Sequence, residues 1–410
     1  MIGRVLMARA LRAFADGFIA VVLPVYLLAL GHGQLEVGII STATLFGSAF
    51  TTLAVGRWGH RFSIRRLLLV ASAAMAVTGC AFAGLSSLWP LLIVAFVGTL
   101  NPSSGDATVF LPLDHTMLAT TAAEARTTVF ARYSFIGSVF AAIGALASGT
   151  PEWLASHGWS MLGALRFMFL VYAAVAIVVW VLYLGLPDPH AQQDRPAVPL
   201  GPSRGIVWRL AALFSVDSFA GGLILNSLLA LWLFQRFGMS LAAAGAFFFW
   251  TGLLAATSQL LAAPLARRIG LINTMVFTHI PSSLCLIGAA FAPTLPLALT
   301  FLLVRSALSQ MDVPARSAFV MSVVTPAERP AAASFTAVPR SLAAAVSPSI
   351  TGAFFAAGAM ATPLVACGVL KIAYDLALFA AFRRVEREMS ASVGDERQCE
   401  RASAYRRPPI

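Results

Sequence analysis

Long apolar segments recur along this 410-residue chain and are separated by short polar breaks. Each segment is close to the ~20 residues that an α-helix needs to cross the hydrocarbon core of a bilayer. Only 11% of the residues are charged, against about 25% in an average soluble domain. This pattern argues against a soluble enzyme, a nucleic-acid reader and a disordered protein, and predicts a polytopic membrane protein. We place twelve spans at residues 12–30, 36–56, 67–85, 89–113, 128–149, 165–186, 209–234, 241–265, 272–292, 295–321, 333–357 and 361–382.

The arginines predict the orientation of these spans. The formal net charge is +11, and the arginine clusters fall in alternate breaks, as they do in cytoplasmic loops under the positive-inside rule. Both termini and the proline-rich polar segment 187–208 are therefore expected in the cytoplasm, which requires an even number of spans. The chain then divides into an N-terminal bundle (1–186), the linker, a C-terminal bundle (209–382) and a charged cytoplasmic tail (383–410).

The two halves of the chain resemble each other in sequence. Gly31 and Gly38 are seven residues apart, and Gly238 and Gly245 repeat that spacing. The acid of the segment SGDATVFLP has a counterpart in QMDVPARSA of the second half. A repeat of six helices implies a pseudo-twofold axis along the membrane normal, with a cavity between the two bundles near the midplane.

The loop after the second span reads GRWGHRFSIRR over residues 56–66. It resembles the signature G-x-L-x-D-R-x-G-R-R of the major facilitator superfamily, with His60 where aspartate is usual, and PLARRIG at residues 264–270 is a weaker copy. The resemblance implies an all-α membrane fold of twelve transmembrane helices in two pseudo-symmetric six-helix bundles. It also implies a loop that latches one conformation against another, whereas the alternative is that its arginines only set topology. The latch residues would be Gly56, His60, Arg61, Arg65, Arg66, Arg267 and Arg268.

Ionisable side chains inside the spans are the candidates for function. Each costs about 2.5–3.5 kcal/mol on insertion scales, so it persists where it faces a cavity or a partner. Asp16 and Asp217 lie about one turn inside the first span of each half. We interpret them as a protonatable site or as gate ion pairs with Arg132 or Arg340; the alternative is a helix cap or a snorkelling acid at the interface.

Asp106 and Asp312 lie deeper in the spans, and Asp106 ends the stretch Asn101-Pro-Ser-Ser-Gly-Asp. Proline and glycine interrupt a helix there, and an irregular backbone at membrane depth is tolerated only beside protein or water. We predict that this stretch lines the cavity; the alternative is that it forms part of a packed hydrogen-bond network between helices. The predicted substrate and proton cavity comprises Asp16, Asn101, Ser104, Asp106, Arg132, Asp217, Arg305, Asp312 and Arg340.

Four further polar residues have simpler interpretations. Lys371 and Asp375 are four residues apart, which is the spacing of an ion pair on one helix. We expect His279 to be a satisfied polar contact rather than a proton relay. We assign Asp114 to an interfacial charge cluster.

No sequence motif of an enzyme is present: there is no P-loop, no Gly-x-Ser-x-Gly, no His-Glu-x-x-His and no paired-cysteine motif. We therefore expect no catalysis, metal or cofactor. The expected function is secondary active transport of a small molecule by alternating access, with protons and the lipid bilayer as further partners, no nucleic acid and a monomeric chain.

Proton-coupled efflux was favoured over the alternative, proton-coupled uptake of a small metabolite. A largely apolar cavity with a few acids suits amphipathic or cationic solutes, and the chain resembles bacterial drug-efflux members of the superfamily. That resemblance implies a bacterial cytoplasmic (inner) membrane as the location. A membrane-embedded enzyme and a non-transporting receptor are the alternatives from other classes.

Overall fold

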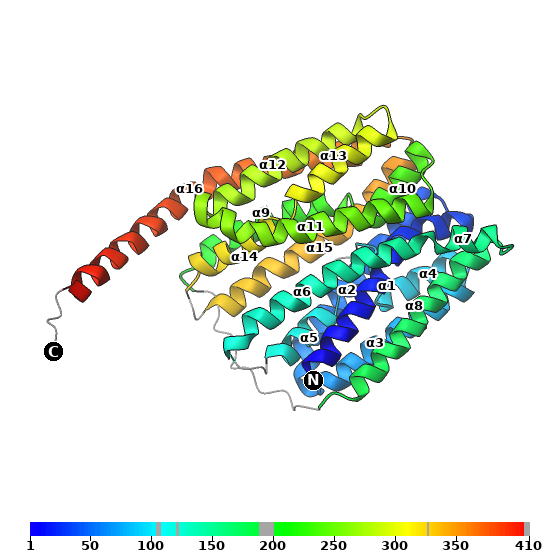
Figure 1. Cartoon of the computed structure of the whole chain (residues 1–410), viewed down its shortest axis with the longest axis horizontal. Helices are drawn as coiled ribbons and strands as arrows, with labels where there is room; N and C mark the ends of the chain where they lie inside the picture. Colours follow the sequence, from blue (N-terminus) through cyan, green and yellow to red (C-terminus); the bar gives the residue numbers. More distant parts are fainter. Residues whose placement is uncertain (104–107, 120–122, 188–200, 326–327, 406–410) are drawn as a thin grey trace.

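The computed structural model describes residues 1–103, 108–119, 123–187, 201–325 and 328–405, and within these residues every regular element is a helix. Figure 1 shows two groups of long helices lying side by side, one from each half of the chain. The N-terminal half contains α1 (Ile2–Ala29), α2 (Gln34–Trp58), α3 (Ile64–Gly84), α4 (Leu88–Val97), α5 (Phe110–Ala119), α6 (Ala123–Leu146), α7 (Thr150–Ser156) and α8 (Met161–Leu184). The C-terminal half contains α9 (Arg204–Gly222), α10 (Asn226–Phe237), α11 (Leu241–Ile269), α12 (Leu271–Ala290), α13 (Leu295–Leu308), α14 (Asp312–Val323), α15 (Arg329–Ala356) and α16 (Thr362–Tyr405).

The twelve predicted spans all appear as helices, and the chain is an all-α membrane protein built from two six-span bundles. Nine helical stretches within the described residues are long and apolar enough to cross a membrane by themselves. The other three spans are the fourth, made of α4 and α5, the tenth, made of α13 and α14, and the eleventh, α15, which carries Arg340 and two interior prolines.

Serine caps and glycine turns explain where several helices begin and end. Ser63, Ser160 and Ser240 each accept a hydrogen bond from a backbone N–H in the first turn of the following helix, which satisfies a donor that the helix leaves free. Gly238 ends α10 with φ of +62°, a left-handed conformation that glycine adopts without steric cost.

Several helices extend beyond their predicted bounds. The first helix begins at Ile2 rather than residue 12, and the last runs to Tyr405 rather than ending near 382, so it projects past the bundle (Figure 1). Helix α9 also begins at Arg204, inside the predicted linker. Hydropathy marks only the apolar part of a helix, and arginine is a good helix former, so the helices continue into their charged ends.

The fourth, seventh and tenth spans are each broken into two helices. Helix α9 ends at Gly222 and α10 begins at Asn226, while α13 ends at Leu308 and α14 begins at Asp312. The break in the fourth span begins after Val97. The breaks of the fourth and seventh spans meet across the two bundles, because Ser227 N donates to the Pro102 carbonyl at 3.1 Å. Broken helices place polar backbone at membrane depth, which is tolerated only beside protein or a cavity.

The two bundles are joined tightly at the end opposite the arginine-rich loops. A Cβ atom added to Gly38 on α2 would lie 2.5 Å from the Pro348 carbonyl oxygen on α15, and one added to Gly245 on α11 would lie 2.5 Å from the Ala145 carbonyl oxygen on α6. Glycine is needed at both positions because the helix backbones touch there. Glu152 strengthens this contact by accepting from Leu241 N at 2.6 Å, at the start of α11 in the other bundle.

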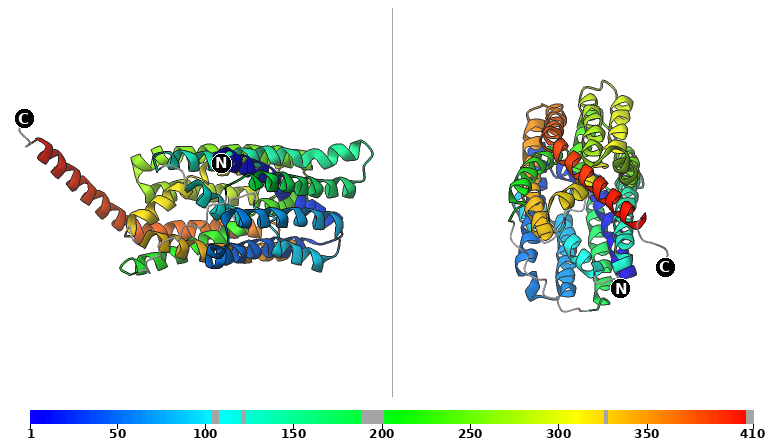
Figure 2. Two further views of the ribbon diagram at one scale, coloured as in Figure 1. Left: turned by 90° about the horizontal axis from the view of Figure 1, so that it is seen from below. Right: turned by 90° about the vertical axis from the view of Figure 1, so that its left-hand side faces the viewer.

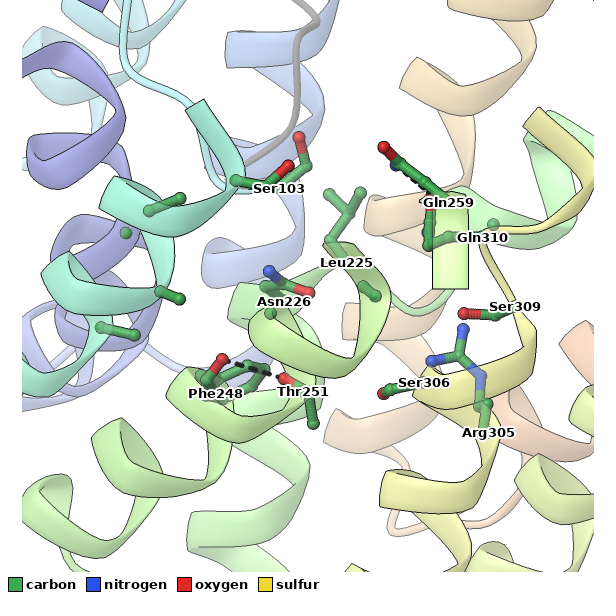
Figure 3. A pocket seen from close by; sticks show the side chains of 18 of the residues that line it. Ser103, Leu225, Asn226, Phe248, Thr251, Gln259, Arg305, Ser306, Ser309 and Gln310 are labelled. Carbon is green, nitrogen blue, oxygen red and sulfur yellow. Dashed lines mark hydrogen bonds between the residues drawn. The ribbon is translucent and has the colours of Figure 1, made fainter. Parts of the chain in front are cut away.

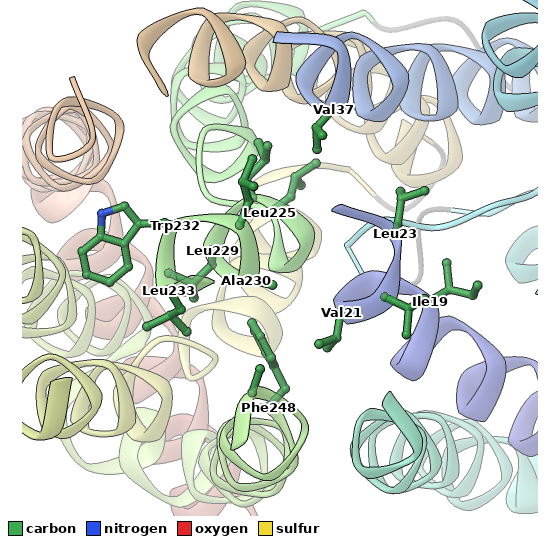
Figure 4. Packing of buried hydrophobic residues seen from close by; sticks show 14 of the residues in the cluster. Ile19, Val21, Leu23, Val37, Leu225, Leu229, Ala230, Trp232, Leu233 and Phe248 are labelled. Atoms are coloured by element: carbon green, nitrogen blue, oxygen red, sulfur yellow. The ribbon is translucent and has the colours of Figure 1, made fainter. Parts of the chain in front are cut away.

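The hydrophobic core differs between the two ends of the molecule. One cluster contains side chains of both halves, among them Val21, Val37, Leu229 and Trp232, and Figure 4 shows these helices meeting. The two other clusters, at the arginine-rich end, each belong to one half; Val5 and Tyr183 represent one, and Phe319 and Phe382 the other. Within the described ranges, the apolar cluster shared by the two bundles therefore lies at the end opposite the arginine-rich loops. The two views of Figure 2 show that the molecule is elongated along its helices, with α16 projecting from one end.

Candidate functional site

A central cavity of about 480 Å³ lies between the two bundles. Its wall is made of α1, α6 and the break of the fourth span on one side and of α9–α14 and α16 on the other (Figure 3). The breaks supply many of its polar groups, because Ser103, Asn226, Ser309 and Gln310 all lie at them. The other uncharged polar side chains in the wall are Ser138, Thr251, Gln259, Ser282 and Ser306.

The charged groups of the cavity wall are cationic. Arg9, Arg305 and Lys371 line it together with His279, and no aspartate or glutamate is among its described lining residues. This differs from the expectation of a cavity lined by acids. Asp217 and Asp312 lie behind the wall, where they pair with Arg316 and Lys371, and so they do not line the open volume.

Arg305 is a cationic group of the cavity wall that is free to contact a ligand. Its guanidinium is held on α13, and within the described residues it has neither a carboxylate partner nor a side-chain hydrogen bond. Figure 3 shows it beside Ser309, with Gln310 near and Asn226 across the cavity. A guanidinium offers five donors in a planar fork that matches a carboxylate or phosphate. The arrangement can therefore bind an anion.

Asp217 on α9 lies behind the wall and joins three helices. Its Oδ1 accepts from Lys371 Nζ on α16 at 2.6 Å, and its Oδ2 accepts from Arg316 on α14 at 2.9 Å. Arg316 also pairs with Asp312, one turn earlier on α14. Arg340, one of the two arginines predicted as gate partners, donates to Ser218 Oγ at 3.1 Å instead.

His279 on α12 connects this cluster to Asp375. The imidazole Nδ1 lies 3.0 Å from both carboxylate oxygens of Asp375, and Nε2 lies 3.4 Å from Lys371 Nζ and 3.9 Å from Asp217 Oδ1. The predicted pair between Lys371 and Asp375 is therefore not formed, since each has a nearer partner on another helix. His279 thus has a polar contact, as expected, and in addition its ring lines the cavity.

The N-terminal bundle holds a separate buried ion pair. Arg12 on α1 donates to Asp114 on α5 at 2.5 Å, and Tyr133 and Tyr183 donate to the same carboxylate at 2.8 and 3.0 Å. Both charged side chains are almost fully buried, and neither lines the cavity. Asp114 therefore belongs to a packed network within one bundle, which corrects its assignment to an interfacial cluster.

The remaining predicted cavity residues lie in different environments. Asp16 is buried on α1 beside the cavity-lining Gly17. Asn101 is buried and accepts from the backbone and hydroxyl of Ser103 at 3.1 and 2.7 Å. Arg132 is exposed on α6. Ser104 and Asp106 lie outside the described residues.

The loop with the superfamily signature contacts its own bundle. Arg65 donates to the Leu184 carbonyl at 2.7 Å, at the C-terminal end of α8, where a cation complements the helix dipole. Gly56, Arg61, Arg66, Arg267 and Arg268 are exposed at this end of the molecule. The side chain of His60 lies outside the described part of the chain, and the latch role stays a prediction.

Sequence reasoning identified Arg305 as a cavity residue but missed three others. Arg9 was counted as a topology-setting arginine, Lys371 was paired along its own helix, and His279 was judged an ordinary contact. A signal for Lys371 was available, because it is the only lysine of the chain and it lies in the middle of an apolar span. Intramembrane ionisable groups mark functional sites by default.

Comparison with known proteins agrees with this architecture. The family profile described as Major Facilitator Superfamily matches residues 5–309. An uncharacterized membrane protein of Saccharomyces cerevisiae, YJR124C, is 24% identical over 414 residues, which cover 92% of each chain. The crystal structure of the nucleoside transporter NupG has a TM-score of 0.71 at 15% identity and covers 93% of this chain and 98% of its own.

The crystal structure of the human organic anion transporter MFSD10 (TETRAN) has a TM-score of 0.61 at 17% identity, covering 92% of this chain and 98% of its own. At these identities the two structures show a shared fold. The fold, the central cavity between two bundles and the family match lead to one identification. The chain belongs to the Major Facilitator Superfamily, whose members are secondary transporters of small molecules.

Proposed function

We propose that this transporter carries a small organic anion and couples its movement to protons. The observation that supports the substrate class is the Arg305 guanidinium, which has no ion-pair partner among the described residues and lies in a central cavity whose described lining includes no carboxylate. A buried charge without a partner is costly, and an anionic substrate would remove that cost. The volume of about 480 Å³ lies within the usual range for small-molecule sites.

The polar groups of the wall suit the rest of such a substrate. Ser306, Ser309 and Gln310 offer hydroxyl and amide groups beside Arg305, and Phe248 offers an apolar face across the cavity. A substrate with one anionic group, a few hydroxyl or amide groups and an apolar part would match them. MFSD10, an organic anion transporter of the same fold, is consistent with this class.

We further propose that the arginine-rich end is cytoplasmic and that the cavity opens toward it. The positive-inside rule supports this orientation. The bundles are sealed at the other end by Gly38, Gly245 and the shared apolar cluster. Alternating access would then separate the bundles at the sealed end and close the cavity at the arginine-rich end. Both termini would lie on the cytoplasmic side of the membrane.

The charge of the substrate bears on the direction of transport. A membrane potential that is negative inside drives anions outward by about 2.3 kcal/mol per charge per 100 mV, so anion efflux needs no coupled proton. Uptake against that potential does need one. The predicted efflux of amphipathic or cationic solutes was based on a largely apolar cavity with a few acids. The cationic wall instead favours an anion, and for an anion carried together with a proton we propose uptake.

Flux into proteoliposomes tests this proposal. The purified chain is reconstituted and assayed with labelled mono- and dicarboxylates, sulfonates and organic phosphates, with nucleosides, sugars and organic amines as comparators. We expect anion flux that an inward proton gradient accelerates and that falls at least tenfold in Arg305→Gln, with Arg236→Gln, exposed at the opposite end, as the matched control. Flux of cations or neutral solutes only, or anion flux unchanged in Arg305→Gln, would overturn the proposed substrate class. Anion flux that the proton gradient drives outward would contradict uptake and support efflux.

A further inference from the structure

We propose that His279 couples proton binding to anion binding by taking Asp217 from Lys371, so that the Lys371 ammonium becomes free to bind the substrate anion. This inference rests on the proposed function and assigns the coupling step to one side chain of the cavity wall. It deepens that function by naming a second cationic group that the substrate would meet after Arg305.

The distances define the state before protonation. Asp375 accepts from the Nδ1–H of His279 at 3.0 Å, which leaves the lone pair on Nε2. Lys371 Nζ lies 3.4 Å from Nε2 and 2.6 Å from Asp217 Oδ1, so it donates to both acceptors at once. In this state the ammonium is occupied by the protein and is withheld from the cavity.

A proton arriving at Nε2 changes both contacts of Lys371. Nε2 becomes a donor, so Lys371 loses one acceptor and gains a like charge 3.4 Å away. Asp217 Oδ1 is only 3.9 Å from Nε2, close enough to accept from the imidazolium after a small side-chain movement. No covalent bond changes except the N–H bond formed at Nε2, and Lys371 keeps its three protons throughout.

The surroundings favour His279 over its neighbours as the proton acceptor. Asp217 already accepts from two cations, and Asp375 is fully buried behind the imidazole, whereas His279 lines the cavity. The charged and titratable groups nearest to it are Asp217 on α9 and Lys371, Tyr374 and Asp375 on α16. Arg305 on α13 lines the same cavity, Arg316 and Asp312 on α14 extend the ion pairs of Asp217, and Cys367 on α16 lies near Lys371. From α11, only Arg267 and Arg268 are charged, and both are exposed at its end.

The single lysine of the chain provides a test that needs no substrate. Protein labelled with ¹³C at lysine Cε gives one resonance, that of Lys371, which is followed by NMR between about pH 5 and pH 8, where histidine changes charge. We expect one pH-dependent step in the wild type and in His157→Gln, whose histidine is exposed. The step should vanish in His279→Gln, because the amide can donate to Asp375 and accept from Lys371 but cannot take up a proton. A step that persists in His279→Gln, or no step in the wild type, would refute the inference.

Binding of benzenesulfonate, which stays ionised across this pH range, separates this inference from the proposed function. We expect its affinity to rise on acidification by up to about tenfold per pH unit, as linkage to one proton allows, and to become independent of pH in His279→Gln. Affinity lost in Arg305→Gln but equally pH-dependent in His279→Gln would leave the anion proposal intact and defeat the role of His279. No Arg305-dependent binding, with the NMR step still present, would defeat the anion proposal alone. If His279→Gln does not fold, Asp375→Asn serves instead, and it should displace the NMR step along the pH scale.

Discussion

Lys371 on α16 donates to Asp217 on α9 across 2.6 Å, and this bond joins the first and last helices of the C-terminal bundle behind the cavity wall. The same carboxylate also accepts from Arg316, which pairs in addition with Asp312, so these two acids balance the two cations. Lys371 therefore lies in the cavity wall with its ammonium group already hydrogen-bonded to Asp217. Any event that removes Asp217 from Lys371 changes the charge that a substrate encounters.

Asp217→Asn is expected to mimic the proton-loaded state. The amide cannot neutralise Lys371, so the affinity for benzenesulfonate at pH 8 should rise about 10- to 100-fold, as expected from a charge-assisted bond of about 1.5–3 kcal/mol. Asp312→Asn is the matched control, because Asp312 pairs with Arg316 and has no bond to Lys371. Titration calorimetry measures both. Equal affinities of the two variants would contradict the claim that Asp217 restrains Lys371.

The seal between the bundles predicts a conformational lock. Thr42 on α2 and Ser349 on α15 lie with their hydroxyl oxygens 2.7 Å apart, in opposite bundles at the sealed end. A Thr42→Cys/Ser349→Cys pair, placed in a chain without its native cysteines, should form a disulfide that holds this end closed. Alternating access requires the two helices to separate, so oxidation should reduce flux more than tenfold and reduction should restore it. Each single cysteine variant should be indifferent to oxidant; full flux in the cross-linked protein would show that α2 and α15 stay together during transport.

The twelve spans follow from the sequence because each span must be apolar over the thickness of a bilayer, which is a local property. The two bundles follow from the linker and the repeat between the halves. The break in the fourth span was predicted from Asn101-Pro-Ser-Ser-Gly. Those of the seventh and tenth spans were not, because Leu223 and Ser309 carry no comparable signal. Three breaks facing one cavity are a tertiary feature, stabilised by contacts such as Ser227 N to the Pro102 carbonyl.

The charges of the site show where sequence reasoning fails. Asp217 and Lys371 are 154 residues apart, and no local spacing relates them. Lys371 and Asp375 have the spacing of a helix pair, yet His279 and Asp217 on neighbouring helices give each a nearer partner. The acids were recognisable as functional candidates. Whether the charge of the cavity wall is positive or negative depends, however, on which of these acids are already paired with cations. That depends on helix rotation, which a sequence does not specify.

Glu328 predicts an acid-sensitive contribution to stability outside the membrane. Hydrogen bonds from Ser203, Thr325 and the Gly201 N–H favour its ionised form and lower the pKa of its carboxyl from 4.5 to about 2. Because the pKa is lowered on folding, the stabilisation is complete above about pH 4.5 and is lost as the pH falls toward about 2. Glu328→Gln should therefore lower the Tm at pH 7, and its difference from the wild type should shrink across that acidic window. Thr325→Val removes one donor to Glu328, so in this variant the stabilisation by Glu328 should begin to be lost at a higher pH than in the wild type. A Tm difference between Glu328→Gln and the wild type that does not vary with pH would exclude this linkage.

The Arg12–Asp114 pair predicts a large effect on stability that is independent of the transport site. Arg12→Ala leaves a buried carboxylate with only two tyrosine donors, and breaking such a pair costs about 3–5 kcal/mol. Replacing both charges, as Arg12→Met/Asp114→Leu, should recover most of this loss because no unpaired charge remains buried. Arg132→Ala, on the exposed face of α6, should change the free energy of unfolding by less than about 0.5 kcal/mol. Thermal unfolding in detergent, followed by thiol-reactive dye, measures all three variants. A double variant as unstable as Arg12→Ala would mean that the pair itself, rather than the avoidance of an isolated charge, stabilises the N-terminal bundle.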